Sequence, residues 1–209
     1  MVTRKISDST VRRLAQYLRF LEQATARGAA TIASGELARL GGTTPAQVRK
    51  DLSFFGSFGK RGLGYSVPDL AAAIRRILGL GRAHRVVVVG AGRLGGALVQ
   101  YQGFRDRGFN ITSVYDSDPK KIGTRWNGVA VRDLRHLEAD LQRDPTDIAI
   151  VVTPADAAQG VVDRLVGAGV RAILNFAPVP LAVPPSVEMK TVNMALELET
   201  LTYALVKNR

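Results

Sequence analysis

The chain has 209 residues, of which 46% are hydrophobic and none is cysteine, and its formal net charge is +11. The length is enough for a buried core in one or two domains, while the lack of cysteine excludes disulfides, thiolate catalysis and metal sites built on sulfur. The first residues, MVTRKISDST, lack the apolar stretch of a signal peptide, and no apolar run approaches the ~20 residues of a membrane helix, so we expect a cytoplasmic protein.

Almost all of the positive charge lies in the first part of the chain. Residues 1–85 hold 15 lysines and arginines against 5 acids, whereas residues 86–209 hold 14 against 13. A nearly neutral second part argues against a general solubility effect and favours a basic module with a polyanionic partner. A solvated basic surface is the alternative, and charge alone does not decide between the two.

Two helices separated by a short β-prone piece are predicted first. Ser9 or Thr10 can cap a helix that ends near Gly28. Its apolar positions keep helical spacing: Val11, Leu14, Leu18 and Leu21. The β-prone stretch ATIA follows, and Ser34 then caps a brief helix that stops at Gly41-Gly42.

The most strongly marked helix start in this part of the chain comes next, in TTPAQVRKDLSFFG. Thr44 and Gln47 form a capping box, and Pro45 falls at the first helical position, where its missing N–H costs nothing. A short helix, a glycine turn and a second well-capped helix are the pattern of a helix-turn-helix, a DNA-binding motif.

The faces of this second helix follow from its 100° turn per residue. The buried face consists of Val48, Leu52 and Phe55. The opposite face carries no acid and consists of Ala46, Lys50 and Ser53, flanked by Gln47 and Arg49. Asp51 falls to the side. Such a face suits the major groove, where Lys50 can reach a guanine edge and Ser53 or Gln47 a base or a phosphate.

The stretch GSFGKRGLGYSV predicts a hairpin, because it has four glycines and alternating apolar residues. Lys60-Arg61 would lie at its tip, as in a wing that places cations against phosphates or in the minor groove. An ordinary hairpin with solvated charges is the alternative, but the helices in front favour DNA binding. A helix with Pro68 at its start and Gly79 at its end then joins the two domains.

From Val86 onward, predicted strands and helices alternate. The strands are 86–89, 111–115, 129–131, 147–152, 171–175 and 187–192, and helical patterns fill most gaps, notably 93–102, 133–142 and 155–167. This order is typical of an α/β fold with a doubly wound, mostly parallel sheet of the Rossmann type.

A dinucleotide-binding fingerprint opens this region. The run Gly90, Ala91, Gly92, Arg93, Leu94 and Gly95 fits G-x-G-x-x-G directly after four valines. Gly90 permits the tight turn, Gly92 lets the backbone approach a pyrophosphate, and Gly95 lets helix and strand pack closely.

Asp116 supplies the second half of the fingerprint, 21 residues beyond Gly95 and directly after the strand ITSVY. A carboxylate there accepts the adenosine ribose hydroxyls and repels the extra phosphate of NADP, although Lys120-Lys121 weakens that selectivity. A surface aspartate that starts a turn is the alternative. VVTPAD and NFAP end later strands on the same side of the sheet, which adds six residues to the predicted site: Thr153, Pro154, Asn175, Phe176, Ala177 and Pro178.

Chemistry on the cofactor is not favoured. The nucleotide fold uses nearly all of the 124 residues that follow residue 85, so little chain remains for a substrate site. His84 and His136 are poorly placed as acid or base groups. We therefore expect a sensor of the dinucleotide and not an enzyme.

The strings QVRKDLSFFGSFGKRGLGY, VVVVGAGRLGGAL, YDSDPKKIG and ILNFAP together resemble the Rex family of bacterial redox-sensing transcriptional repressors. The resemblance covers essentially the whole chain. It implies a homodimer that binds palindromic operator DNA and releases it when NADH binds, so that gene expression follows the NADH/NAD⁺ ratio. The residues it assigns to DNA are Thr44, Gln47, Arg49, Lys50, Ser53, Lys60, Arg61 and Tyr65.

The resemblance also implies three parts: a winged helix domain (1–80), a Rossmann NAD(H)-binding domain (81–193) and a C-terminal helix exchanged between subunits (194–209). The tail agrees independently, because it is apolar on two sides and needs two surfaces to cover it. Leu198, Leu201 and Leu205 lie on one side, and Leu196 and Tyr203 on another. Its own linker region could cover one side; a second subunit is the favoured cover.

Two residues depart from the family pattern. The family usually carries Asp and Phe where this chain has Asn193 and Met194. In the family, the Asp is associated with pairing across the dimer to the residues that correspond to Arg93 and Tyr101. A neutral amide cannot form an ion pair, so we expect cofactor binding with a weaker switch.

Two other interpretations stay open. An NAD-dependent oxidoreductase with an appended basic domain would turn over a substrate and would not need DNA. A repressor that answers to another nucleotide or a sugar metabolite would bind DNA and ignore NADH.

Overall fold

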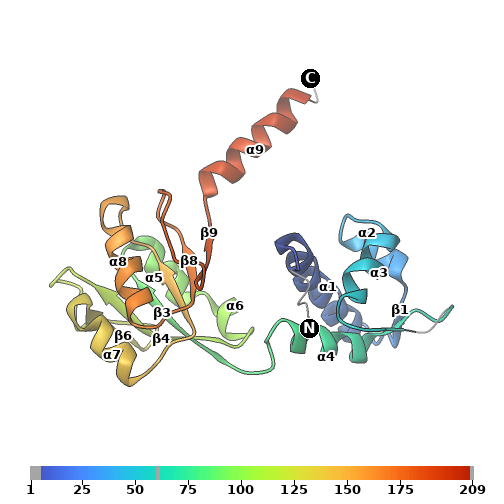
Figure 1. The fold of residues 1–209 in the computed structure, drawn as a ribbon, viewed down its shortest axis with the longest axis horizontal. Coiled ribbons are helices and arrows are strands. Elements are labelled where there is room, and N and C mark those ends of the chain that lie inside the picture. The colour runs from blue at the N-terminus through green and yellow to red at the C-terminus, as the bar shows by residue number, and fades with distance from the viewer. Residues whose placement is uncertain (1–5, 60–61, 208–209) are drawn as a thin grey trace. The chain divides into compact units, whose positions relative to one another are not determined.

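The computed structural model describes residues 6–59 and 62–207, and the chain divides into two compact units, Met1–Arg82 and Ala83–Arg209 (Figure 1). The division falls close to the predicted domain boundary. Among the described residues, no helix combines the length and the apolar character that crossing a bilayer requires.

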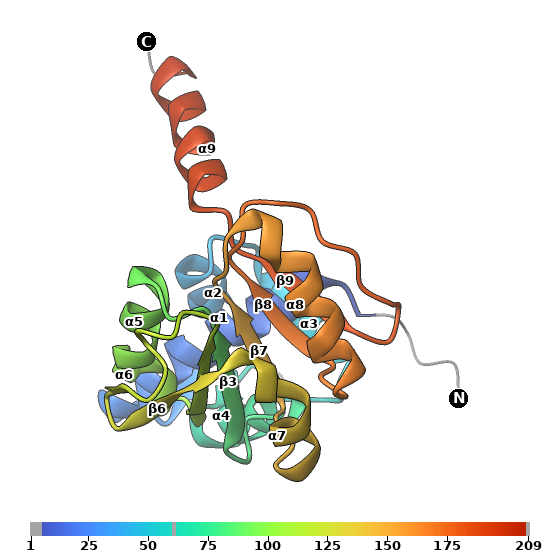
Figure 2. The same ribbon diagram turned by 90° about the vertical axis from the view of Figure 1, so that its left-hand side faces the viewer.

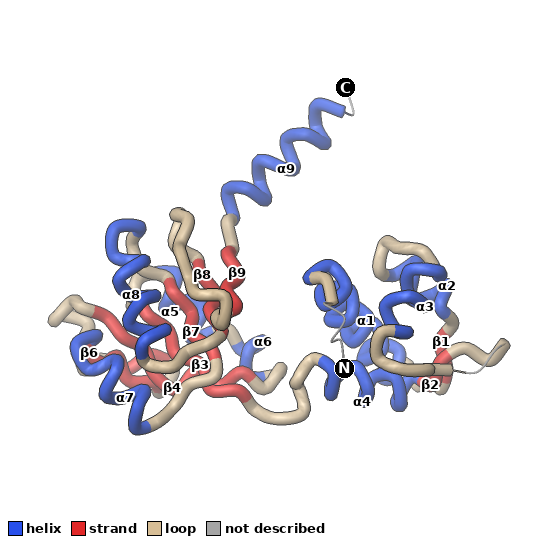
Figure 3. Tube along the Cα trace, in the orientation of Figure 1, coloured by secondary structure: helices blue, strands red, loops and turns tan. Residues whose placement is uncertain are grey.

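Unit 1 is a small helical domain with a two-stranded antiparallel sheet, whose strands lie side by side (Figure 3). Its elements are α1 (Asp8–Ala26), β1 (Thr31–Ile32), α2 (Ser34–Leu40), α3 (Pro45–Ser53), β2 (Tyr65–Ser66) and α4 (Val67–Ile77). One core cluster joins all four helices and includes Leu14, Leu18, Leu37, Val48, Leu52, Leu70 and Ile74.

The helix-turn-helix forms as predicted. Gly42 turns the chain between α2 and α3 with a left-handed φ of 59°, and the Thr43 amide donates to the Ala38 carbonyl. The Thr44 hydroxyl accepts from the Gln47 amide at 3.1 Å, and Pro45 is the first residue of α3. These two predictions are confirmed, but the Gln47 side chain does not return to Thr44 as a full capping box would require.

Three local predictions for the other helices are wrong. Ser7 caps α1 instead of Ser9 or Thr10, and its hydroxyl accepts from the Thr10 amide. Ser34 does not cap α2, because it is the first helical residue and Ala33 holds the N-cap position; the Ser34 hydroxyl accepts from the guanidinium of Arg49 at 3.1 Å. Val11 is 43% exposed, because the buried stripe of α1 passes through Thr10 and Tyr17.

The predicted hairpin is a closely folded loop. Among the described residues of this loop, no strand precedes β2, and Tyr65–Ser66 pairs with Thr31–Ile32 across the domain. The two limbs nevertheless approach each other, since a Cβ at Gly59 would lie 2.6 Å from the Gly64 carbonyl oxygen. Lys60-Arg61, predicted at the tip, lies outside the described residues.

Asp51, expected at the side of α3, is fully buried, and it joins α3 to α1. Its carboxylate accepts from Arg13 Nε at 2.6 Å and Nη2 at 2.8 Å, from Tyr17 Oη at 3.0 Å and from Gln47 Nε2 at 2.8 Å. Burial raises the pKa of this carboxyl group, but the hydrogen bonds, from Arg13 first, outweigh burial and hold the pKa below its ordinary value. Asp51 is therefore an ionised hub of unit 1, by which we mean a buried carboxylate that accepts hydrogen bonds from both α1 and α3.

Unit 2 is a seven-stranded sheet with helices on both faces (Figure 2). Its strands are β3 (His84–Val89), β4 (Phe109–Asp116), β5 (Arg125–Trp126), β6 (Val129–Asp133), β7 (Ile148–Val151), β8 (Ala172–Asn175) and β9 (Glu188–Thr191), and their order is β5-β6-β4-β3-β7-β8-β9. All neighbours pair in parallel except β5 with β6. The predicted doubly wound sheet is confirmed; β5, only two residues long, was not predicted.

The helices of unit 2 are α5 (Arg93–Gln100), α6 (Gln102–Arg105), α7 (Leu137–Arg143), α8 (Ala155–Gly167) and α9 (Met194–Lys207), with a short 3₁₀ turn at Leu134–His136. Alternate valines of β3 face opposite sides of the sheet. Val87 and Val89 pack with α7 and α8, while Val86 and Val88 pack in the cluster that includes α5. The predicted helix 93–102 is broken at Tyr101, and 133–142 begins with the 3₁₀ turn.

The last helix, α9, buries none of its described side chains. Its large apolar residues are all exposed: Met194, Leu196, Leu198, Leu201, Tyr203, Leu205 and Val206. Asn193 starts the helix, because its side-chain Oδ1 accepts from the Leu196 amide at 3.1 Å. An apolar helix of this kind is stable in water only when another surface covers it.

We predict that Asp51→Ala lowers the stability of unit 1 by roughly 3 kcal/mol, because the substitution leaves the Arg13 guanidinium without its counter-ion. Hydrogen exchange of the α1 and α3 amides measures the loss. The control is Glu22→Gln, which breaks an ion pair with the half-exposed Arg75 and should cost less than about 1 kcal/mol.

The same variant has a pH signature. Because the folded pKa of Asp51 is lowered, its stabilisation is present above the ordinary aspartate pKa of about 4 and is lost as pH falls through the folded pKa. The difference between the native chain and Asp51→Ala should therefore shrink in acid. A difference that stays constant with pH would contradict an ionised hub.

Candidate functional site

The parallel strands bring the predicted cofactor residues to one edge of the sheet. Val89 at the end of β3 pairs in register with Tyr115 of β4 on one side and Val151 of β7 on the other, and Val151 pairs with Asn175 of β8. The segments that follow these strands therefore meet at the carboxyl edge, where the order of strands reverses around β3. Open α/β sheets bind their ligands at this position.

The glycine turn after β3 allows backbone contacts that no side chain would permit. Gly90 has a φ of 112°, and a Cβ there would lie 2.6 Å from the Val152 carbonyl oxygen. A Cβ at Gly95 would lie 2.0 Å from the Gly90 carbonyl oxygen, so α5 can approach β3 only with glycine. A Cβ at Gly92 would meet nothing within 4 Å. The space in front of Gly92, at the start of α5, is open to a ligand.

Asp116 ends β4 beside this turn. Its Oδ2 accepts from the Ala91 amide at 2.6 Å, its Oδ1 from the Asp118 amide at 2.8 Å, and Lys121 Nζ lies 3.3 Å from Oδ2. Burial raises the pKa of this carboxyl group, but the hydrogen bonds from the two amides and Lys121 lower the pKa by a larger amount, so the net shift is downward. The ionised carboxylate keeps lone pairs for ribose hydroxyls, while Lys121 offsets part of its charge.

Thr153, just after β7, carries an unpaired polar atom. Its Oγ1 is buried and has no hydrogen-bond partner among the described residues. Thr153 lies against the glycine turn, since its backbone nitrogen would be 3.2 Å from a Cβ at Gly90. A buried hydroxyl without a partner costs free energy unless a bound molecule satisfies it, so this atom fits a ligand at the edge.

The segment NFAP after β8 is ordered from within. Asn175 is fully buried, and its amide group bonds both the N–H and the C=O of Ala177, at 2.8 Å and 3.2 Å. The Phe176 amide donates to the Val151 carbonyl at 2.8 Å. Asn175 therefore shapes the segment. Any ligand contact from this segment falls to the half-buried Phe176 and the exposed Pro178.

A groove of about 700 Å³ continues from the glycine turn along α5. It is lined by Ala91, Gly92, Arg93, Gly96, Ala97, Gln100, Lys121 and Trp126. Trp126, the only tryptophan, belongs to the strand that was not predicted, and its ring lies 3.5 Å from the position of a Cβ at Gly96. Lys121 and Trp126 are candidate site residues that the fingerprint alone does not identify. Within the described residues, no three His, Cys, Asp or Glu side chains form a metal site.

The second predicted surface is the outer face of α3. Arg49, Lys50 and Ser53 are exposed there, and Gln47 is half-buried. The hydroxyl of Ser53 donates to the Lys50 carbonyl at 2.7 Å. The Thr44 hydroxyl accepts a hydrogen bond from the Gln47 backbone amide and so caps the helix. Tyr65 is only 8% exposed and packs in the core of unit 1, so a contact between its ring and DNA stays a prediction.

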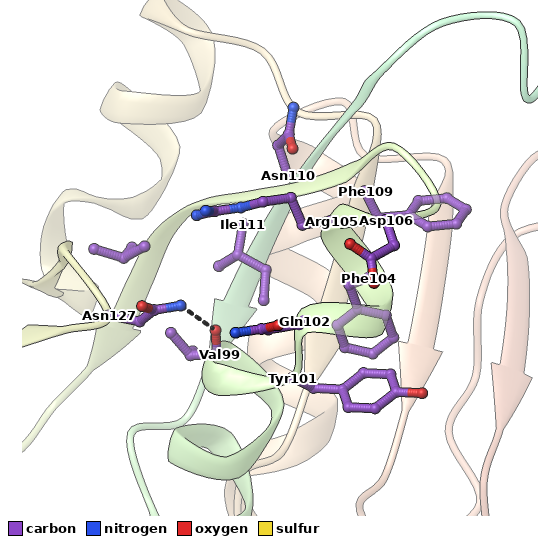
Figure 4. Close-up of a pocket in the computed structure, with 11 residues that line it drawn as sticks. Val99, Tyr101, Gln102, Phe104, Arg105, Asp106, Phe109, Asn110, Ile111 and Asn127 are labelled. Atoms are coloured by element: carbon purple, nitrogen blue, oxygen red, sulfur yellow. Dashed lines mark hydrogen bonds between the residues drawn. The ribbon is translucent and has the colours of Figure 1, made fainter.

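The four residues predicted to act between subunits lie at separate places in unit 2. Arg93 is exposed at the start of α5 and pairs with no acid among the described residues. Tyr101 is 60% exposed at the end of α5, and its ring meets the edge of Phe104 at 5.1 Å between ring centres. Both rings line a cavity of about 520 Å³ with Arg105 and Asn127 (Figure 4). Asn193 and Met194 begin α9.

The chain matches two family models, "CoA binding domain" over residues 82–179 and "Putative DNA-binding protein N-terminus" over residues 5–53. It is similar to the redox-sensing transcriptional repressor Rex of Desulfitobacterium hafniense, with 51% identity over 97% of each chain. It is also similar to that of Streptomyces coelicolor, with 45% identity over 96% of this chain and 78% of the relative.

Two solved structures cover 98% of the chain. One is RSP, a Rex-family repressor, with a TM-score of 0.91, 36% identity and 96% of that chain covered. The other is RSP in complex with β-NAD⁺ and operator DNA, with a TM-score of 0.93, 38% identity and 94% covered. RSP is also solved with β-NADH.

Proposed function

The chain belongs to the Rex family of redox-sensing transcriptional repressors, and from that membership we propose that it binds palindromic operator DNA as a homodimer and releases the DNA when NADH binds. The observation that carries the proposal is the match, over nearly the full length, to a repressor solved with NAD⁺ and operator DNA. Gene expression would then follow the NADH/NAD⁺ ratio in the cytoplasm, where the DNA lies.

Unit 1 is the DNA-binding part of this proposal. Its α3 serves as the recognition helix in the major groove, with Lys50 and Ser53 facing base edges and Arg49 facing the phosphates. Lys60 and Arg61 add charge that attracts the phosphate backbone. The excess of cations in residues 1–85 supports this assignment.

Unit 2 holds the dinucleotide. We assign the pyrophosphate to the open backbone at Gly92 and the start of α5, and the adenosine ribose to Asp116. The unpaired Thr153 hydroxyl and the segment from Phe176 to Pro178 line the rest of the edge. The protein would sense the NADH/NAD⁺ ratio through the form of the dinucleotide, NADH or NAD⁺, that occupies this site.

The proposal includes no catalysis. The named relatives are transcriptional repressors, and we assign the residues at the carboxyl edge to binding and ordering of the dinucleotide. His84 stacks on Phe109 at the amino end of β3, away from that edge, and His136 is exposed before α7.

A second copy of the chain is the partner that α9 requires. Unit 2 also carries a mainly apolar groove of about 300 Å³ on its sheet, lined by residues of β3, β7, β8 and β9 with Phe104 and Phe109. An exposed apolar helix and an exposed apolar groove on one protein complement each other across a two-fold axis. We propose that α9 of each subunit covers its partner.

The function is tested by operator binding. DNA selected by the protein from a randomised duplex library should be an inverted repeat, and its affinity should fall on addition of NADH and change little on addition of NAD⁺. Binding that ignores NADH would contradict the proposal and favour a repressor of another ligand. Turnover of NADH with a small substrate, without DNA binding, would favour an oxidoreductase.

Cofactor choice tests the ribose assignment. NADH should bind more tightly than NADPH, because the carboxylate of Asp116 repels the extra phosphate, and Asp116→Ala should narrow that gap. Lys121→Ala, which removes the cation that offsets Asp116, should widen it. Fluorescence of Trp126 in the groove gives both affinities. Equal affinities in the native chain would overturn the assignment.

Dimerisation tests the role of α9. Leu201→Glu should convert the dimer to a monomer at micromolar concentration, because it places a charge in an apolar contact. Glu197→Gln on the same helix is the control, because it introduces no new charge, and it should leave the dimer intact. Light scattering reports the mass. A native monomer, or a dimer that tolerates Leu201→Glu, would contradict this role.

A further inference from the structure

The side chain of Gln47 is held by a neighbour on its own helix. The carboxamide nitrogen Nε2 donates to Asp51 Oδ1 at 2.8 Å, one turn further along α3. Asp51 is itself fully buried and fixed by Arg13 and Tyr17 of α1. Gln47 is only half-buried and lies in the first turn of the recognition helix, whose N-terminal residues contact base edges in helix-turn-helix proteins.

The chemistry of Asp51 fixes which way the carboxamide faces. An ionised carboxylate accepts hydrogen bonds and donates none, and the hydrogen bonds around Asp51 keep it ionised. A carboxamide turned by 180° would set its oxygen against that carboxylate and lose the bond. Gln47 therefore has one orientation, with Nε2 on Asp51. Its Oε1 acceptor and its second Nε2 hydrogen remain for a partner outside the protein.

One acceptor beside one donor is the pattern that matches adenine. In the major groove adenine presents the N6 amino donor and the N7 acceptor, and a glutamine carboxamide pairs with both at once. Guanine presents two acceptors at the same place, N7 and O6, so Oε1 would face an acceptor without a hydrogen.

We propose that Asp51 is a positioning residue for sequence recognition, which sets the Gln47 carboxamide to read an adenine in each operator half-site. Asp51 itself is buried and touches no DNA. The inference rests on the proposed function, since it assigns a base to the surface that the operator meets. It adds a specificity determinant that charge on α3 does not supply.

The alternative use of Gln47 is purely structural. The i, i+4 bond from Gln47 to Asp51 would then stabilise α3 and leave base preference unaffected. Base preference at one position therefore separates the two roles, whereas stability does not.

The test is selection from a randomised duplex library, with base preferences measured at every position for the native chain and three variants. Asp51→Asn gives Gln47 a neighbour that can also donate, so the carboxamide can turn, and the adenine-over-guanine preference at one position should fall roughly tenfold. Gln47→Met keeps the length of the side chain and removes both polar atoms, and it should flatten the same position by a similar factor.

Gln159→Met is the matched control. Gln159 Nε2 donates to Asp163 Oδ1 at 2.8 Å, the same i, i+4 pair on α8 of unit 2. The control should leave every base preference unchanged. Circular dichroism and NADH binding establish that each variant is folded. If Asp51→Asn does not fold, the base preferences of Gln47→Met test the inference.

The outcomes keep the two proposals distinct. If the native chain selects no sequence, the repressor function fails and this inference fails with it. If the native chain selects an inverted repeat but Gln47→Met retains every preference, only the positioning role is overturned. Loss of an adenine preference at one position, shared by Gln47→Met and Asp51→Asn, supports it.

Discussion

The burial of one ionised carboxylate, that of Asp51, holds α3 against α1 behind the outer face that we assign to DNA, and the constraint it imposes is electrostatic. A charge removed from water must be matched by donors on all sides, and Arg13, Tyr17 and Gln47 supply them. The donors come from α1 as well as α3, so the angle between these helices is fixed by hydrogen-bond geometry as well as by apolar packing.

In unit 2 the corresponding constraint is steric, and glycine residues satisfy it. A ligand at the carboxyl edge needs backbone amides at close range, and the turn at Gly90, together with the approach of α5 at Gly95, makes that backbone accessible. The edge also contains the unpaired hydroxyl of Thr153 and the ionised Asp116. Each unit therefore has its own candidate site, and the proposed regulation requires that the occupancy of one changes the affinity of the other.

Much of this could be predicted from the sequence because short-range rules govern it. Thr44 and Pro45 mark the start of α3, the valines of β3 and the glycines that follow them mark the fingerprint, and the parallel order of strands follows from their alternation with helices. The rest depends on contacts between distant residues. Asp51 lies on the wheel between the two faces of α3, and only its contact with Arg13, 38 positions earlier, reveals that it is buried. In the sequence Ser34 has the features of a helix cap, but in the structure its hydroxyl accepts a hydrogen bond from Arg49. The strand β5 has only two residues and therefore shows no periodicity, so the sequence does not predict that Trp126 lines the groove.

Linkage between the two sites is the central claim, and it is measured most directly from the cofactor side. If NADH weakens operator binding, the operator must weaken NADH binding by the same factor. Couplings of this kind are typically ~5- to 150-fold, and we expect the low end because Asn193 is a neutral amide that cannot form an ion pair. The measurement is the Kd of NADH with and without a saturating operator duplex. We expect a higher Kd of NADH with the duplex bound, by the same factor by which NADH weakens operator binding, and an unchanged Kd would contradict linkage between the two sites.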